Sequence, residues 1–92
     1  MEQLTKQEKI DALCQMLTEI QDPADCAALL EDMCTRKEVE NMAERVFAAK
    51  LLMEGNTYNQ VIAKANISSA TLSRVSRCVQ YGSGYSKLLK GE

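Results

Sequence analysis

Signals for the start of a helix recur along the whole sequence, and they constrain the fold more than any other feature. The spacing of a capping box, a Thr followed three residues later by a Glu, occurs twice, at Thr5 and Glu8 and at Thr35 and Glu38. Asp22 precedes Pro23, the only proline, as expected for a cap followed by a first helical turn. Apolar residues recur at spacings of three and four, without the alternation typical of strands. We therefore predict an all-α fold of five to six short helices.

The predicted helices follow these signals closely. They cover residues 6–20, 23–34, 36–54 and 58–65. A fifth helix starts from a cap at Ser68 or Ser69 and runs to residue 81, and one further short helix passes through Leu88 and Leu89. Gly55 and Asn56 are expected to end the third helix, because both tolerate the left-handed conformation of a helix C-cap. That helix carries apolar residues on more than one side, so we expect it to be buried on two faces. A chain of 92 residues buries little surface alone, so a partner copy is expected to help.

Charge divides the sequence into two parts. Residues 1–56 carry six Lys and Arg against twelve Asp and Glu, whereas residues 57–92 carry five against one, so the formal charges are −6 and +4. This asymmetry suggests that the second part faces a polyanion. A solvated basic surface would explain the same numbers, and charge alone does not separate the two interpretations.

Several classes of function find no support in the sequence. It contains no histidine, no Gly-rich phosphate loop and no nucleophile motif, so we expect no enzyme, no catalytic residue and no required cofactor. The four cysteines form no Cys-x-x-Cys pair, so we expect no metal site and interpret them as small buried hydrophobic residues: Cys14, Cys26, Cys34 and Cys78. The polar start of the sequence and the lack of a long apolar run indicate a cytoplasmic protein without a membrane partner.

The segment "TYNQVIAKANISSATLSRVSRCVQYG" carries the functional signal. Thr57 is suited to cap a helix over 58–65, and Ser68 or Ser69 to cap a second one ending near residue 81. Asn66 between them tolerates the left-handed conformation that a tight turn requires. Two short helices joined in this way form a helix-turn-helix. Its apolar wedge is predicted to consist of Val61, Ile67, Leu72 and Val75.

The outer side of the second helix has the chemistry of a DNA-contacting surface. In helix-turn-helix proteins the N-terminal part of this helix enters the major groove. Serine and arginine bind base edges and phosphates, and alanine can contact a thymine methyl group. The candidate DNA-binding residues are Asn59, Lys64, Ser68, Ser69, Ala70, Thr71, Ser73, Arg74 and Arg77. A surface hairpin that binds no nucleic acid is the alternative.

The whole pattern resembles one known family. The segments "ERVFAAKLLMEG", "SSATLSRV" and "GSGYSKLL" are similar to the Trp repressor superfamily, most closely to its YerC/YecD branch. The resemblance implies an intertwined homodimer that binds double-stranded operator DNA as a sequence-specific transcriptional regulator, typically a repressor. It implies a single domain over 1–92, with dimerisation helices in 1–56, the helix-turn-helix in 57–81 and a C-terminal tail in 82–92.

The resemblance also implies an amino-acid corepressor as a candidate ligand. Four ligand-contacting positions of the family match here in residue type: Thr35, Arg45, Thr71 and Arg74. Two positions depart, because a serine of the family is Cys78 here and a glycine is Val75. Valine would occupy space that a flat indole ring needs, and cysteine is a poorer hydrogen-bond partner than serine. These departures count against tryptophan itself.

A protein–protein interaction module without direct DNA binding remains the main alternative function. The acidic first half and its methionines, Met16, Met33, Met42 and Met53, could present an adaptable surface. Methionines at helical spacing are more often core residues. Salt dependence separates the two functions, because the affinity of a DNA-binding protein falls steeply as the salt concentration rises.

Overall fold

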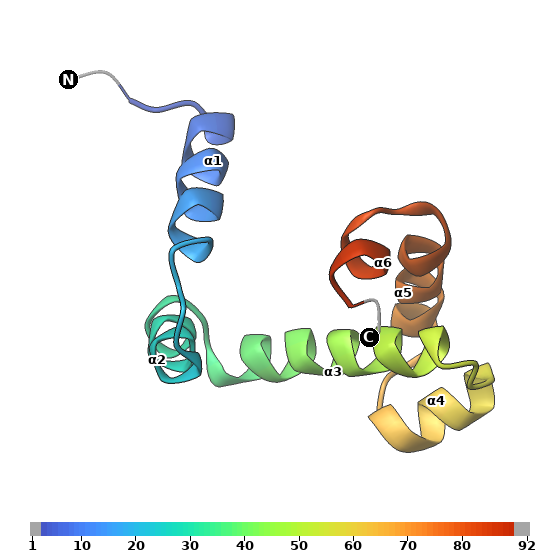
Figure 1. The fold of residues 1–92 in the computed structure, drawn as a ribbon. Coiled ribbons are helices and arrows are strands. Elements are labelled where there is room, and N and C mark those ends of the chain that lie inside the picture. The colour runs from blue at the N-terminus through green and yellow to red at the C-terminus, as the bar shows by residue number, and fades with distance from the viewer. Residues whose placement is uncertain (1–2, 90–92) are drawn as a thin grey trace. The chain divides into compact units, whose positions relative to one another are not determined.

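The computed structural model describes residues 3–89, which contain six helices and no strand (Figure 1). The helices are α1 (Lys6–Leu17), α2 (Pro23–Met33), α3 (Arg36–Met53), α4 (Tyr58–Ala65), α5 (Ser69–Tyr81) and α6 (Gly84–Leu88). The predicted all-α class with a helix-turn-helix is confirmed. Two compact units make up the chain, Met1–Thr35 and Arg36–Glu92.

Local capping interactions explain where the helices of the first unit begin. The Thr5 hydroxyl accepts the Glu8 N–H at 3.0 Å, and the Glu8 carboxylate accepts the Thr5 N–H at 2.8 Å. Asp22 accepts the Ala24 N–H at 2.9 Å, and Pro23 occupies the first position of α2. The α1 helix ends at Leu17, three residues before the predicted end at residue 20. Beyond Leu17 the chain continues in tighter turns, in which the Glu19 N–H donates to the Met16 carbonyl at 3.1 Å and the Ile20 N–H to the Leu17 carbonyl at 3.3 Å.

The first unit has no core of its own. Neither α1 nor α2 contains a buried residue, and the apolar side of α1 is 40–51% exposed at Ile10, Leu13, Met16 and Leu17. The predicted burial of the cysteines is therefore wrong here, since Cys14 is exposed and Cys26 and Cys34 are only half-buried. The two short helices of this unit bury no side chain, so they do not enclose these thiols.

The core of the second unit lies between α3, α4 and α5. Eight apolar residues are buried there: Ala48, Ala49, Leu51, Val61, Ala65, Ile67, Leu72 and Val75. They include the whole predicted wedge of the helix-turn-helix, which is confirmed as buried. The small side chains of Ala48 and Ala49 are fully covered, and they allow the neighbouring helices to pack close to α3. The short α6 packs against α5 and α3.

Burial of α3 on two faces is not observed within the chain. Its buried residues are Ala48, Ala49 and Leu51, which lie toward the helix-turn-helix. Met42, Val46 and Phe47 remain 40–47% exposed. The predicted burial of α3 on two faces is therefore wrong for the single chain. The α4, α5 and α6 helices cover one side of α3 and leave its second, apolar side exposed.

Two glycines mark the ends of the long helices. Gly55 after α3 has φ 98°, as predicted for a left-handed helix end, and the Asn56 side chain donates to the Leu51 carbonyl at 2.9 Å. A Cβ atom on Gly82 would lie 2.7 Å from the Cys78 carbonyl oxygen. A side chain at residue 82 would therefore collide with the last turn of α5, where the chain turns away toward α6.

Candidate nucleic-acid interface

The turn between α4 and α5 is fixed by its own side chains. Thr57 forms a capping box with Gln60 at the start of α4, and Ser68 accepts the Thr71 N–H at 3.2 Å at the start of α5. The Ser68 hydroxyl also donates to the Thr71 hydroxyl at 3.0 Å. Asn66 has φ 53° and ψ 47°. The predicted caps and the predicted left-handed asparagine are thus confirmed, and three residues separate the two helices.

The α5 helix has one buried side and one exposed side. Leu72, Val75 and Ser76 are buried. On the opposite side Ser69, Ala70, Ser73, Arg74 and Arg77 are all exposed, as their spacing predicts. We call these five residues the polar face of α5. Because the buried side holds the helix in the core, the polar face is presented on a rigid support.

The remaining candidate DNA-binding residues lie at the start of α5 and on α4. Thr71 is half-buried, and Ser68 is exposed at the start of α5. Asn59 and Lys64 belong to α4, and the Lys64 ammonium lies 3.1 Å from the Asn56 side-chain oxygen. The roles of these residues in DNA binding stay predictions.

The sequence of the helix-turn-helix carries charges of one sign only. Between Glu54 and Glu92 the sequence contains no acidic residue. Within residues 3–89, the side chains of Lys64, Arg74 and Arg77 form no ion pair, and all three are exposed. Their charges are therefore available to an anionic partner.

Comparison with known proteins identifies the family. Residues 8–91 match the Trp repressor protein family. The chain belongs to this family. It is 36% identical over 74 residues to the uncharacterized protein YerC of Bacillus subtilis (strain 168), an alignment covering 80% of this chain and 71% of that protein.

Two solved structures have the same fold. One is a TrpR-like protein from Eubacterium eligens ATCC 27750, with a TM-score of 0.86 and 32% identity, covering 92% of this chain and 89% of that one. The other is a candidate Trp repressor from Staphylococcus aureus, with a TM-score of 0.83 and 28% identity, covering 94% of this chain and 92% of that one.

The positions matched to the family's ligand site are only partly brought together. Arg45 and Thr71 line one pocket of about 210 Å³, together with Asn41, Glu44, Asn66, Ile67 and Ser68. Arg74 is exposed on α5 and does not line it, and Thr35 belongs to the other unit. Val75 is only 2% exposed, because it is part of the core. Sequence reasoning missed Asn41 and Glu44, although Glu44 and Arg45 follow Asn41 by three and four residues, which places all three on one side of α3.

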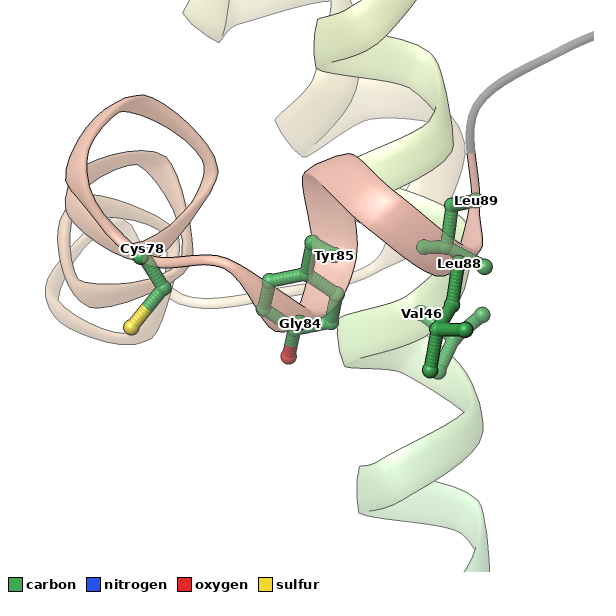
Figure 2. A pocket seen from close by; sticks show the side chains of 7 residues that line it. Val46, Cys78, Gly84, Tyr85, Leu88 and Leu89 are labelled. Carbon is green, nitrogen blue, oxygen red and sulfur yellow. The ribbon is translucent and has the colours of Figure 1, made fainter.

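A second, apolar groove lies beside the end of α5. Figure 2 shows Val46 of α3 with Tyr85, Leu88 and Leu89 of the C-terminal segment, and Cys78 of α5. The groove has a volume of about 470 Å³, and Gly82 and Gly84 complete its lining. Cys78 is half-buried rather than buried as predicted, because its side faces this groove instead of the core. Sequence reasoning missed the groove because it left the tail uncertain.

Residues 3–89 contain neither a metal-binding cluster nor a membrane-spanning helix. Over residues 3–89, no three or more Cys, Asp or Glu side chains gather in a way that could hold a metal ion. In the same part of the chain, no helix combines the length and the apolar character needed to span a bilayer.

Proposed function

We propose that this member of the Trp repressor family is a sequence-specific DNA-binding transcriptional regulator that acts as a homodimer in the cytoplasm, as a repressor and without catalytic activity. The polar face of α5 is the observation that carries the proposal. A helix whose far side is buried in a core presents serines and arginines outward, and no acidic residue stands near them in sequence.

Each kind of side chain on this face has a function in DNA recognition. Arg74 and Arg77 can each donate two hydrogen bonds to a guanine. Ser69 and Ser73 can bind base edges or phosphates. Lys64 near the end of α4 and Ser68 at the start of α5 can hold the phosphate backbone and fix the orientation of α5. Phosphate contacts of this kind supply affinity, while the arginines supply sequence preference.

The homodimer is supported by the apolar surfaces that the single chain leaves uncovered. Ile10, Leu13 and Leu17 of α1 and Val46 of α3 are between 40% and 51% exposed. The groove beside Val46 and Leu88 adds to this apolar surface within the second unit. A second copy would remove such side chains from water, which contributes about 25 cal/mol per Å² of apolar surface. Two copies also place two recognition helices on one palindromic operator.

Selection of bound sequences from a random duplex library tests the proposal. We expect an enriched palindrome whose half-sites lie about one helical turn apart. Affinity for it should fall steeply as the salt concentration rises. If no sequence is enriched and binding vanishes at physiological salt, the interaction module without DNA binding replaces this proposal.

Substitutions on the polar face test the role of α5. Arg77→Ala and Ser73→Ala should each weaken operator binding, with about 1–3 kcal/mol lost for the arginine, measured by fluorescence anisotropy. Lys37→Ala on α3 removes a positive charge outside the helix-turn-helix and serves as the matched control. Unchanged operator affinity in both polar-face variants would contradict the assignment.

A small-molecule corepressor is the second part of the proposal. The candidate positions are Thr35, Arg45, Thr71 and Arg74, of which Arg45 and Thr71 share a pocket. The burial of Val75 in the core argues against an indole ring at that position. Operator affinity measured with and without each of the common amino acids tests whether any of them acts as a corepressor.

A further inference from the structure

A single line of exposed side chains runs along α5 and ends at Tyr81. Ala70, Arg74, Arg77 and Tyr81 follow one another at spacings of four, three and four residues, which places them on the same side of a helix. All four are exposed. We call these four residues the outer line of α5. The first three belong to the polar face, so Tyr81 extends that face by one further turn.

The exposure of Tyr81 is unusual for a large side chain in this protein. Tyr81 is 82% exposed, more than any other large hydrophobic residue within residues 3–89. It is nevertheless held in the helix, because the Gly82 N–H donates to the Cys78 carbonyl at 2.8 Å and closes the last turn of α5. A lone exposed aromatic residue indicates nothing by itself. Its place on the outer line, one turn beyond Arg77, is the observation that links it to DNA binding.

The side chains of the outer line become longer toward the end of the helix. Ala70 lies near the start of α5, the two arginines lie in its middle, and Tyr81 is its last residue. A small side chain lets the helix backbone come close to the base edges, whereas a long one is needed to reach DNA from farther away. This order favours a docking in which α5 enters the major groove by its N-terminal end and its C-terminal end lies farther out.

The length of the outer line then places Tyr81 at the phosphate backbone. Ala70 and Tyr81 are eleven residues apart, which corresponds to about 16.5 Å along the helix axis at about 1.5 Å per residue. The major groove is about 8.5 Å deep and about 12 Å wide. A helix whose start lies at the floor of the groove therefore carries its end beyond the groove, where sugars and phosphates form the rim.

We infer that Tyr81 contacts the DNA backbone, where its phenol hydroxyl donates a hydrogen bond to a phosphate oxygen and its ring covers the neighbouring sugar. The inference rests on the proposed function and adds a residue to it. Tyrosine is among the side chains that bind phosphates in protein–DNA complexes. The sequence has no acidic residue between Glu54 and Glu92 that would repel a phosphate here. Because a phosphate contact carries no sequence information, Tyr81 fixes the tilt of α5 and not the choice of operator.

Removal of the hydroxyl alone tests the inference by fluorescence anisotropy with the full-length protein. Tyr81→Phe should lower the affinity for the selected operator by about three- to tenfold, and the affinity for a scrambled duplex of the same length by the same factor. Tyr85→Phe is the matched control, because it removes the same hydroxyl from a half-buried tyrosine that packs against the core, and it should leave both affinities unchanged. Unchanged affinities in Tyr81→Phe, a loss confined to the operator, or an equal loss in Tyr85→Phe would overturn the inference.

An added charge at the same position provides a second measurement. Tyr81→Lys places an ammonium group at the end of the outer line, and the slope of log K against the logarithm of the salt concentration should steepen by about 0.9 for one more phosphate neutralised. Gln15→Lys adds the same charge at an exposed position of α1 and should leave the slope unchanged. No change in Tyr81→Lys, or an equal change in both variants, would place residue 81 away from the phosphates.

The proposed function and the role of Tyr81 fail in different ways. If the wild-type protein binds no duplex, the proposed DNA-binding function fails and the role of Tyr81 fails with it. If the wild-type protein selects a palindrome and both Tyr81 variants bind DNA as it does, with the same affinity and the same salt slope, only the role of Tyr81 fails.

Discussion

The two units of the chain differ in where their apolar side chains go. Every buried apolar residue found in residues 3–89 belongs to the second unit, in or beside α3, α4 and α5. The α1 and α2 helices carry leucines, methionines and an isoleucine at helical spacing, yet none of these is buried. Similar amphipathic patterns thus lead to a core in one unit and to uncovered surfaces in the other.

This difference separates two sources of stability. The helix-turn-helix is held by contacts within its own unit, between α3, α4 and α5. The first unit has the caps of two good helices but no buried side chain to hold them. Since tertiary packing supplies most of the stability of short helices, α1 and α2 need a surface outside their own unit. In the proposed dimer, a second copy provides that surface.

Separating the units should give the largest effect. A peptide of residues 1–35 should lose nearly all helical signal in far-UV circular dichroism, because α1 and α2 have 12 and 11 residues, and helices shorter than about 12–15 residues are marginal alone. A fragment of residues 36–92 should remain helical and melt cooperatively. Cooperative melting of the 1–35 peptide at low concentration would break the comparison, because it would show a core that the structure lacks.

A substitution in the core of the second unit should come next in size. Leu72→Ala removes a fully buried side chain and should lower the free energy of unfolding by about 2–5 kcal/mol, measured by urea denaturation. The control is Leu4→Ala, because Leu4 is 56% exposed in the first unit. An equal loss from both leucines would mean that burial within the chain does not decide their contributions.

A charge on α1 should have its effect through the partner copy. Leu13→Asp places a carboxylate on the uncovered apolar side of α1 and should weaken dimer affinity by about 100-fold or more, since an unpaired charge at an interface is costly. Analytical ultracentrifugation measures the change. Gln15→Asp adds the same charge to an exposed polar position of α1 and should leave the dimer intact.

Sequence patterns predicted the local structure well because local interactions determine it. Thr5, Asp22, Thr57 and Ser68 each cap a helix, as their residue types indicate. Asn66 adopts the left-handed conformation between α4 and α5. The exposed side of α5 follows from its spacing alone, so the positions of Ser73, Arg74 and Arg77 were also predictable.

Burial was predicted less well, because spacing shows that a side is apolar but not what covers it. The second side of α3, with Val46 and Phe47, and the cysteine Cys14 have apolar patterns but remain exposed in the single chain. The polar pocket was missed for a related reason. Its lining brings Glu44 of α3 together with Thr71 of α5, and such a distant pairing has no periodic signature in a single sequence.

Removing one helix cap should give the smallest effect and sharpen the comparison further. Ser68→Ala deletes the hydroxyl that accepts the Thr71 N–H and should lower the free energy of unfolding by about 1 kcal/mol, because α5 is part of the core. Thr5→Ala deletes the equivalent bond at the start of α1, where the Thr5 hydroxyl accepts the Glu8 N–H. In samples dilute enough to be monomeric, this second substitution should fray α1 while changing the urea midpoint much less, since α1 buries nothing within the chain. Equal shifts of the midpoint would show that α1 and α5 unfold as one cooperative unit even without a partner.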